Sequence, residues 1–209
     1  MIAVLFVERN SIYKSYPGLD CYDEDRDART FPGGIPVIAH PPCRLWGRLY
    51  KLSTAPESEK DLARFAVAQI RQWGGVLEHP AHSKLWKDQG LPLPGDYSNP
   101  LDFTLDIDQF WFGHLAKKRT WLYIHGITVN DLPQYTINLN LITHVVATSS
   151  RKNMQAKYLK KSLRNGTPAK MAEWLIELAR RIPSPTPAAG VRKPAQDTRR
   201  TQRTDSTAQ

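Results

Sequence analysis

The chain has 209 residues, a hydrophobic content of 41% and a formal net charge of +9. This length favours one domain with a substantial core, and no run of about 18 apolar residues is present to span a membrane. Two cysteines cannot make a disulfide framework, so we expect a reducing, cytoplasmic setting. The positive charge favours a polyanionic partner, with nucleic acid as the first candidate. The sequence leaves the oligomeric state open.

The N-terminal region is expected to begin with a buried strand at residues 2–8, because this run is almost entirely apolar. Its apolar part is short and has no basic leader, which favours a strand over a signal peptide. Residues 9–34 are polar and are interrupted by glycine and proline. We interpret them as a loop with room for one short strand.

A β-α-β unit is the clearest structural pattern in the chain. Short apolar runs at residues 35–39 and 76–78 predict two buried strands. Between them, the pattern from Thr54 to Glu57 predicts a capping box that opens a helix running to Trp73. The connections between these strands and the helix are short, so the two strands should be parallel neighbours joined by a right-handed crossover.

The C-terminal half should add further strands and one helix. Residues 101–126 predict a strand or hairpin region with a turn near Gly113, and residues 144–148 predict a last short strand. Apolar residues at helical spacing predict a helix from Thr167 to about Arg181, with its apolar stripe packed on the core.

These elements predict an α/β fold, a reduced Rossmann-like and mostly parallel sheet flanked by helices, in a single domain at residues 1–182. Residues 183–209 are rich in Pro, Thr, Arg and Gln and should form a disordered basic tail. The tail holds five Arg or Lys and two Asp, a net +3 of the total +9. The domain itself is therefore basic as well.

Two chemically active side chains follow the strands of the β-α-β unit. Cys43 comes after Pro42, close behind the first strand, and Glu78 ends the second. Ligands gather at the carboxyl edge of such a sheet. A thiolate there can add to C6 of a pyrimidine ring while an acid serves the ring nitrogen N3. Cys43 and Glu78 are thus candidate catalytic residues, flanked by His40 and His79.

Basic residues near these positions are candidates for nucleic-acid binding. Arg44 and Arg48 flank Cys43, where they are expected to lower its pKa and attract phosphate. Lys117, Lys118 and Arg119 form a second cluster, in which Arg119 can make a two-pronged phosphate contact. Taken alone, such a cluster is more often a solvated turn.

Other interpretations of the same residues stay open. A Pro-Pro-Cys sequence can be a strand end with a buried structural cysteine. His40, Cys43, His79 and His82 together have the side-chain types of a zinc site. The sequence contains no His-x-Glu, which disfavours a zinc-dependent base deaminase, and we expect no metal.

Three segments, taken in order, give a resemblance to the DNA cytosine-5 methyltransferase family. They are Pro42-Cys43, then Glu78-His79-Pro80, then the stretch from Phe112-Gly113 to Lys117-Lys118-Arg119 that leads into Trp121. The resemblance implies DNA as substrate, Cys43 as nucleophile and Glu78 as the acid that contacts the base. The whole chain also looks like small phage- or prophage-encoded proteins, which would place it in a bacterial host.

The family resemblance also implies S-adenosylmethionine as methyl donor. The glycine-rich donor loop of that family is not visible after the first strand, where Glu8 stands instead. The resemblance leaves Glu8, Asp23 and Asp25 as candidates for the donor site. The family's large target-recognition segment is also missing.

Two functional hypotheses follow. The first is an enzyme of the cytosine-5 methyltransferase type that modifies pyrimidines in DNA. The second is a non-enzymatic module that binds nucleic acid or protein on a degenerate methyltransferase scaffold, such as a phage factor acting against host defence.

Overall fold

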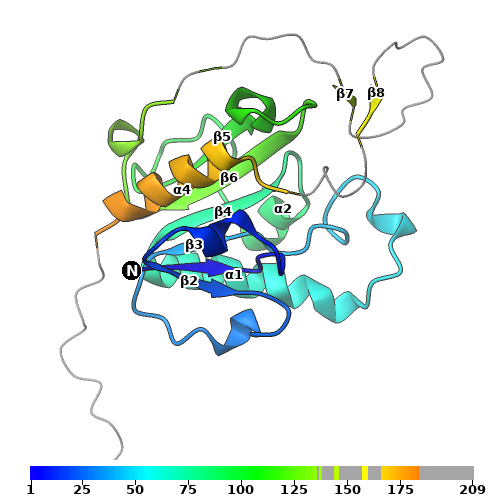
Figure 1. The fold of residues 1–209 in the computed structure, drawn as a ribbon, viewed down its shortest axis with the longest axis horizontal. Coiled ribbons are helices and arrows are strands. Elements are labelled where there is room, and N and C mark those ends of the chain that lie inside the picture. The colour runs from blue at the N-terminus through cyan, green and yellow to red at the C-terminus, as the bar shows by residue number, and fades with distance from the viewer. Residues whose placement is uncertain (136, 138–143, 146–156, 160–165, 184–209) are drawn as a thin grey trace, which may run out of the picture.

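A six-stranded mixed sheet with helices on both faces gives the protein an α/β fold (Figure 1). The computed structural model describes residues 1–135, 137, 144–145, 157–159 and 166–183. The strand order is β2-β1-β3-β4-β6-β5. The strands are β1 (Ile2–Leu5), β2 (Leu19–Tyr22), β3 (Val37–Ala39), β4 (Gly75–Pro80), β5 (Asp102–Asp108) and β6 (Arg119–His125).

Strands β1 to β4 are mutually parallel, whereas β6 runs antiparallel to β4 and β5 runs antiparallel to β6. The predicted β-α-β unit is confirmed, because β3 and β4 are parallel neighbours. The short strand for which residues 9–34 left room is β2, at one edge of the sheet. The C-terminal half adds the antiparallel hairpin of β5 and β6, with Gly113 in the connection as expected.

Helix α1 (Lys60–Trp73) joins β3 to β4. It begins later than the sequence indicated, and the capping box at Thr54 is wrong. Pro56 starts a short 3-10 turn at Glu57–Glu59, and this turn leads into the helix without a side-chain cap. At the other end, Gly75 lies so close to β3 that a Cβ there would stand 2.1 Å from the Val37 carbonyl oxygen. A glycine is therefore required where β4 first pairs with β3.

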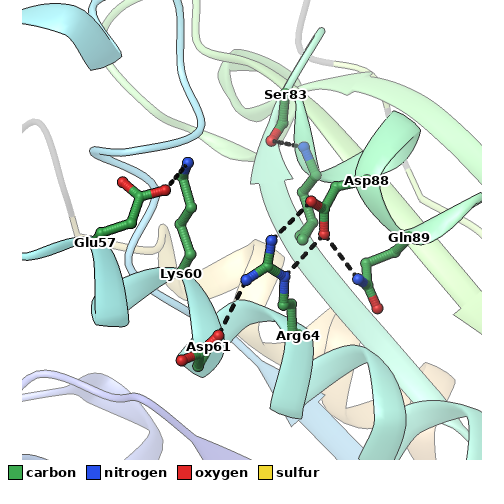
Figure 2. Close-up of polar contacts among 8 residues, drawn as sticks. Glu57, Lys60, Asp61, Arg64, Ser83, Asp88 and Gln89 are labelled. Atoms are coloured by element: carbon green, nitrogen blue, oxygen red, sulfur yellow. Dashed lines mark hydrogen bonds and ion pairs between the residues drawn. The ribbon is translucent and has the colours of Figure 1, made fainter.

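Helix α1 and helix α2 (Leu85–Gln89) cover one face of the sheet. Figure 2 shows how they are joined: Arg64 donates two hydrogen bonds to Asp88, at 2.8 and 3.0 Å, and a third to Asp61. At the start of α2 the Ser83 hydroxyl accepts from the Leu85 N–H. These contacts hold the segment that follows β4 against α1.

Helix α4 (Ala169–Arg181) covers the opposite face, close to the predicted bounds. Its apolar stripe is buried on the strands, so its predicted packing role is confirmed. A separate small sheet pairs β7 (His144–Val145) with β8 (Lys157–Tyr158), while residues 146–148 of the predicted last strand lie outside the described residues.

The predicted tail at residues 183–209 also lies outside the described residues, apart from Pro183. Among the described residues, no helix combines the length and the apolar character that crossing a membrane requires.

Candidate functional site

Cys43 and Glu78 come from neighbouring parallel strands and lie toward their carboxyl edge. Cys43 follows the end of β3 by four residues, and Glu78 lies in the last half of β4. The residue Cys43 is exposed and lies outside the buried core, although burial of its thiol is the largest cause of its raised pKa. The negative charge of Glu78 acts on the Cys43 thiol, since it is one cause of the raised Cys43 pKa.

The Glu78 carboxylate is held by three side chains from three other parts of the fold. Its Oε2 atom lies 3.4 Å from His40 Nδ1, just beyond β3. Its Oε1 atom accepts from Gln109 Nε2 at 2.7 Å, at the end of β5, and lies 3.5 Å from Thr120 Oγ1 on β6. Only 15% of the Glu78 side chain is exposed, so the carboxylate sits in a nearly closed polar cluster.

Strand alternation explains why these groups meet. Val76 of β4 and Leu122 of β6 belong to the core beneath α4, and side chains two residues along a strand share a face. Glu78 and Thr120 therefore point to the α4 face at the carboxyl end of β4. Tyr13 closes the cluster from the loop after β1, because its hydroxyl lies 3.0 Å from His40 Nε2.

The pKa of Glu78 is lowered to about 2. Burial by itself raises this pKa, but the His40 hydrogen bond and the positive charge of Lys118 outweigh it. The carboxyl group is therefore ionised at neutral pH and accepts hydrogen bonds. A proton required by a bound base must be supplied to it by another group.

The pKa of Cys43 is raised, which corrects the expectation that Arg44 and Arg48 would lower it. Burial of the thiol is the largest cause of the raised pKa, and the negative charge of Glu78 is the second. The positive charge of Lys118 lowers the Cys43 pKa. Arg44 forms an ion pair with Glu59 instead, and Arg48 is exposed. The resting form of Cys43 is a thiol, so activation requires a change in its surroundings.

The second basic cluster is divided between two sides of the sheet. Arg119 alternates with Thr120, so it faces the α1 side, where it pairs with Asp106 of β5. Lys117 is exposed, and Lys118 is half-buried and lowers the pKa of both Cys43 and Glu78. Lys118 is thus the member of the cluster that acts on the candidate site.

His79 lies on the face opposite to Glu78. It is fully buried, and its Nδ1 atom lies 2.7 Å from Ser83 Oγ. Burial lowers its pKa to about 4, while the Glu78 charge and the Pro42 carbonyl act in the other direction. His79 is therefore neutral at pH 7.

The zinc alternative finds no support in the part of the chain that the structure describes. No group of three or more His, Cys, Asp or Glu there could hold a metal ion. His82 packs against the Trp121 ring, with centroids 4.9 Å apart, on the α1 side of the sheet.

The three donor-site candidates lie in the loops after β1 and β2. Glu8 is exposed, and Asp25 pairs with Arg9 at 2.9 Å. Asp23 accepts from Lys14 and from two backbone N–H groups of its own loop. Both aspartates are thus already paired with neighbouring cations or backbone N–H groups. In addition, no glycine lies between Phe6 and Pro17, where a glycine would let a ligand approach the backbone closely. These residues do not fit S-adenosylmethionine as a cradle.

Tyr13, Gln109 and Thr120 are members of the site that the sequence did not single out. Tyr13 lies in a segment interpreted as loop, and Gln109 and Thr120 lie in the hairpin region, where no motif distinguished them. Their roles depend on which strand pairs with β4.

No protein-family model and no curated protein matches this sequence.

Proposed function

We propose that the chain is an enzyme that modifies a pyrimidine base in DNA, with Cys43 as nucleophile, on a reduced Rossmann-like sheet. The observation that carries this proposal is that Cys43, a surface residue just after β3, and Glu78, a nearly buried carboxylate on β4 held by His40 and Gln109, come from adjacent parallel strands. Both groups lie toward the carboxyl edge of adjacent parallel strands, where open α/β sheets bind ligands.

The charges at the site support a reaction in which binding of the substrate base activates the nucleophile. As N3 of the bound base takes up a proton and pairs with Glu78, the negative charge of the carboxylate is neutralised. The Glu78 charge then no longer raises the Cys43 pKa, so a larger fraction of Cys43 is present as the thiolate. A base inside a duplex cannot reach this site without leaving the stack, so single-stranded or flipped-out nucleotides are the expected substrates.

A hydrogen-exchange assay tests nucleophilic addition without any methyl donor. When a thiolate adds to C6, the C5 position becomes a carbanion equivalent and takes up a solvent proton. Elimination then removes the original C5 hydrogen and releases the thiolate. DNA containing deoxycytidine or deoxyuridine tritiated at C5 should therefore lose tritium to water in the presence of the protein.

Cys43→Ser should abolish tritium release, because a hydroxyl is a far poorer nucleophile than a thiolate at neutral pH. Cys21→Ser is the matched control, since Cys21 is the other cysteine and lies on β2 at the sheet edge. Unchanged melting temperatures would show that both variants fold. Equal release from wild type and Cys43→Ser, or none from wild type, would remove the enzyme proposal.

The alternative is a binding module without catalysis. It is favoured by the raised pKa of Cys43 and by the lack of fit for S-adenosylmethionine. A Cys43→Ser, Glu78→Gln double variant would then keep full DNA affinity and full biological activity.

Under either hypothesis, binding to DNA should weaken steeply with added salt, because phosphate contacts release counterions. Replacing Lys117, Lys118 and Arg119 with alanine should reduce that dependence if this cluster contacts phosphate.

A further inference from the structure

His40 connects Glu78 to a buried tyrosine. Its Nδ1 atom lies 3.4 Å from Glu78 Oε2, and its Nε2 atom lies 3.0 Å from the Tyr13 hydroxyl. The two rings pack with centroids 5.3 Å apart. Tyr13 is 1% exposed, and 13% of the His40 side chain is exposed. The imidazole is therefore fixed at both nitrogen atoms.

The two partners of His40 place different requirements on the hydrogens of its ring nitrogens. An ionised carboxylate can only accept, so the Nδ1 atom facing Glu78 must carry a hydrogen. A phenol hydroxyl can donate to a bare nitrogen or accept from an N–H, so Tyr13 suits Nε2 with or without a proton. This arrangement accommodates both the neutral and the doubly protonated imidazole without moving a side chain.

We propose that His40, in its doubly protonated form, supplies through Glu78 the proton that the pyrimidine N3 takes up when Cys43 adds to C6. Tyr13 positions the imidazole and serves it in both protonation states. This inference rests on the proposed function and identifies the source of its proton.

The step balances as follows in bonds and protons. The Cys43 thiol gives its proton to solvent water, the Sγ–C6 bond forms, and the electron pair of the cytosine C5–C6 double bond moves through C4 to N3. Glu78 takes the Nδ1 proton of His40 and passes a proton to N3. The imidazolium becomes neutral imidazole. Elimination of the thiolate returns the proton along the same path.

The groups around His40 leave it as the suitable donor. Glu78 lacks a proton at neutral pH, because its pKa is lowered to about 2. Burial is the largest cause that raises the Tyr13 pKa well above its usual value, and the charge of Glu78 adds to it, so Tyr13 stays a phenol. The positive charge of Lys118 acts on Glu78, whereas His79 is neutral at pH 7 and the raised pKa of Cys21 keeps that residue a thiol.

The first test reads the proton position directly and needs no activity. Nitrogen NMR of the full chain labelled in histidine, with His40→Gln to assign the signal, should show the neutral His40 proton on Nδ1. Free imidazole side chains favour Nε2, so this is a distinctive signature. Glu78→Gln should weaken the Nδ1 preference. A neutral His40 with its proton on Nε2 in the wild type would overturn the inference.

The second test measures the use of that proton in tritium release from C5. His40→Gln keeps an amide donor toward Glu78 but has no proton to give, and release should fall by about 100-fold, the usual scale for general acid catalysis. The fall in wild-type rate toward high pH should be absent in His40→Gln. Tyr13→Phe should give a smaller loss. A merely structural His40 would leave the shape of the pH profile unchanged.

The outcomes separate the two proposals. Wild-type release that persists undiminished in His40→Gln overturns the proton path and leaves the Cys43 nucleophile standing. Absence of release from the wild type overturns the proposed function, and the proton path with it. Residual release in His40→Gln that is reduced but keeps the wild-type pH profile would assign His40 to folding and overturn its role as donor.

Discussion

Two carboxylates at the same edge of the sheet, Glu78 and Asp23, have similar acidity for different reasons. Both have a pKa lowered to about 2. The Asp23 pKa is lowered chiefly by Lys14, from the loop after β1, and by the backbone N–H of Arg26, from its own loop after β2. Glu78 reaches this value against burial, through His40 and Lys118. Equal acidity therefore does not mean an equal role, because the Asp23 charge acts on Cys21 whereas the Glu78 charge acts on Cys43, the candidate nucleophile.

Removing the Glu78 side chain should give the largest effect on stability. Glu78→Ala leaves His40 without its carboxylate and removes one of the two acceptors of Gln109, and it should lower the free energy of unfolding by about 3–5 kcal/mol. Urea denaturation measures this change. Asp25→Ala is the matched surface control and should leave the transition midpoint nearly unchanged. Equal losses would mean that the loop after β2 is as integral to the fold as the Glu78 cluster.

The pH dependence of stability should separate Glu78 from its neighbour His79. Glu78 has a pKa near 2 when folded against a usual 4.5, so its contribution is present above pH 4.5 and is lost as pH falls toward 2. His79 has a pKa near 4 against a usual 6.5, so its contribution is full above pH 6.5 and is lost as pH falls toward 4. Each amounts to about 3 kcal/mol.

Unfolding curves at a series of pH values check these two windows. Glu78→Gln should flatten the dependence between pH 4.5 and 2, and His79→Asn should flatten it between pH 6.5 and 4. An unchanged slope between pH 6.5 and 4 in His79→Asn would show that His79 is not held neutral by burial.

The reactivity of Cys43 offers a smaller but more local test. Glu78→Gln removes a negative charge that raises the Cys43 pKa, and Lys118→Met removes a positive charge that lowers it. Alkylation by iodoacetamide at pH 7 should become roughly fivefold faster in the first variant and slower in the second, for a charge interaction of about 1 kcal/mol. Asp25→Asn should leave the rate unchanged. Faster alkylation in Lys118→Met would reverse the assigned electrostatics.

The smallest expected effect concerns the loops after β1 and β2. S-adenosylmethionine at millimolar concentration should leave the melting temperature unchanged, since Asp23 and Asp25 are already paired and no cradle for the donor is formed. Scanning calorimetry with and without the compound measures this. A clear upward shift, abolished by Asp23→Asn, would show that these loops rearrange into a donor site.

The sequence by itself determined the β3-α1-β4 unit and the position of Cys43 and Glu78 toward the carboxyl ends of its two parallel strands. A helix-length segment with short joints between two apolar runs leaves little choice but parallel neighbouring strands, and side chains behind such strands share an edge. The same local logic identified the final helix, whose apolar spacing fixes its buried face. It failed at Thr54, where Pro56 and a 3-10 turn displaced the start of the helix.

Only the tertiary structure decided what surrounds the two reactive groups. Gln109 and Thr120 reach Glu78 because β6 pairs with β4 in one register, and Tyr13 reaches His40 because β1, which precedes its loop, pairs with β3. Arg119 is directed away from the site by strand alternation, one residue from Thr120. The pKa of a side chain depends on burial and on charges brought together by folding, which is why adjacent arginines in sequence did not lower the pKa of Cys43.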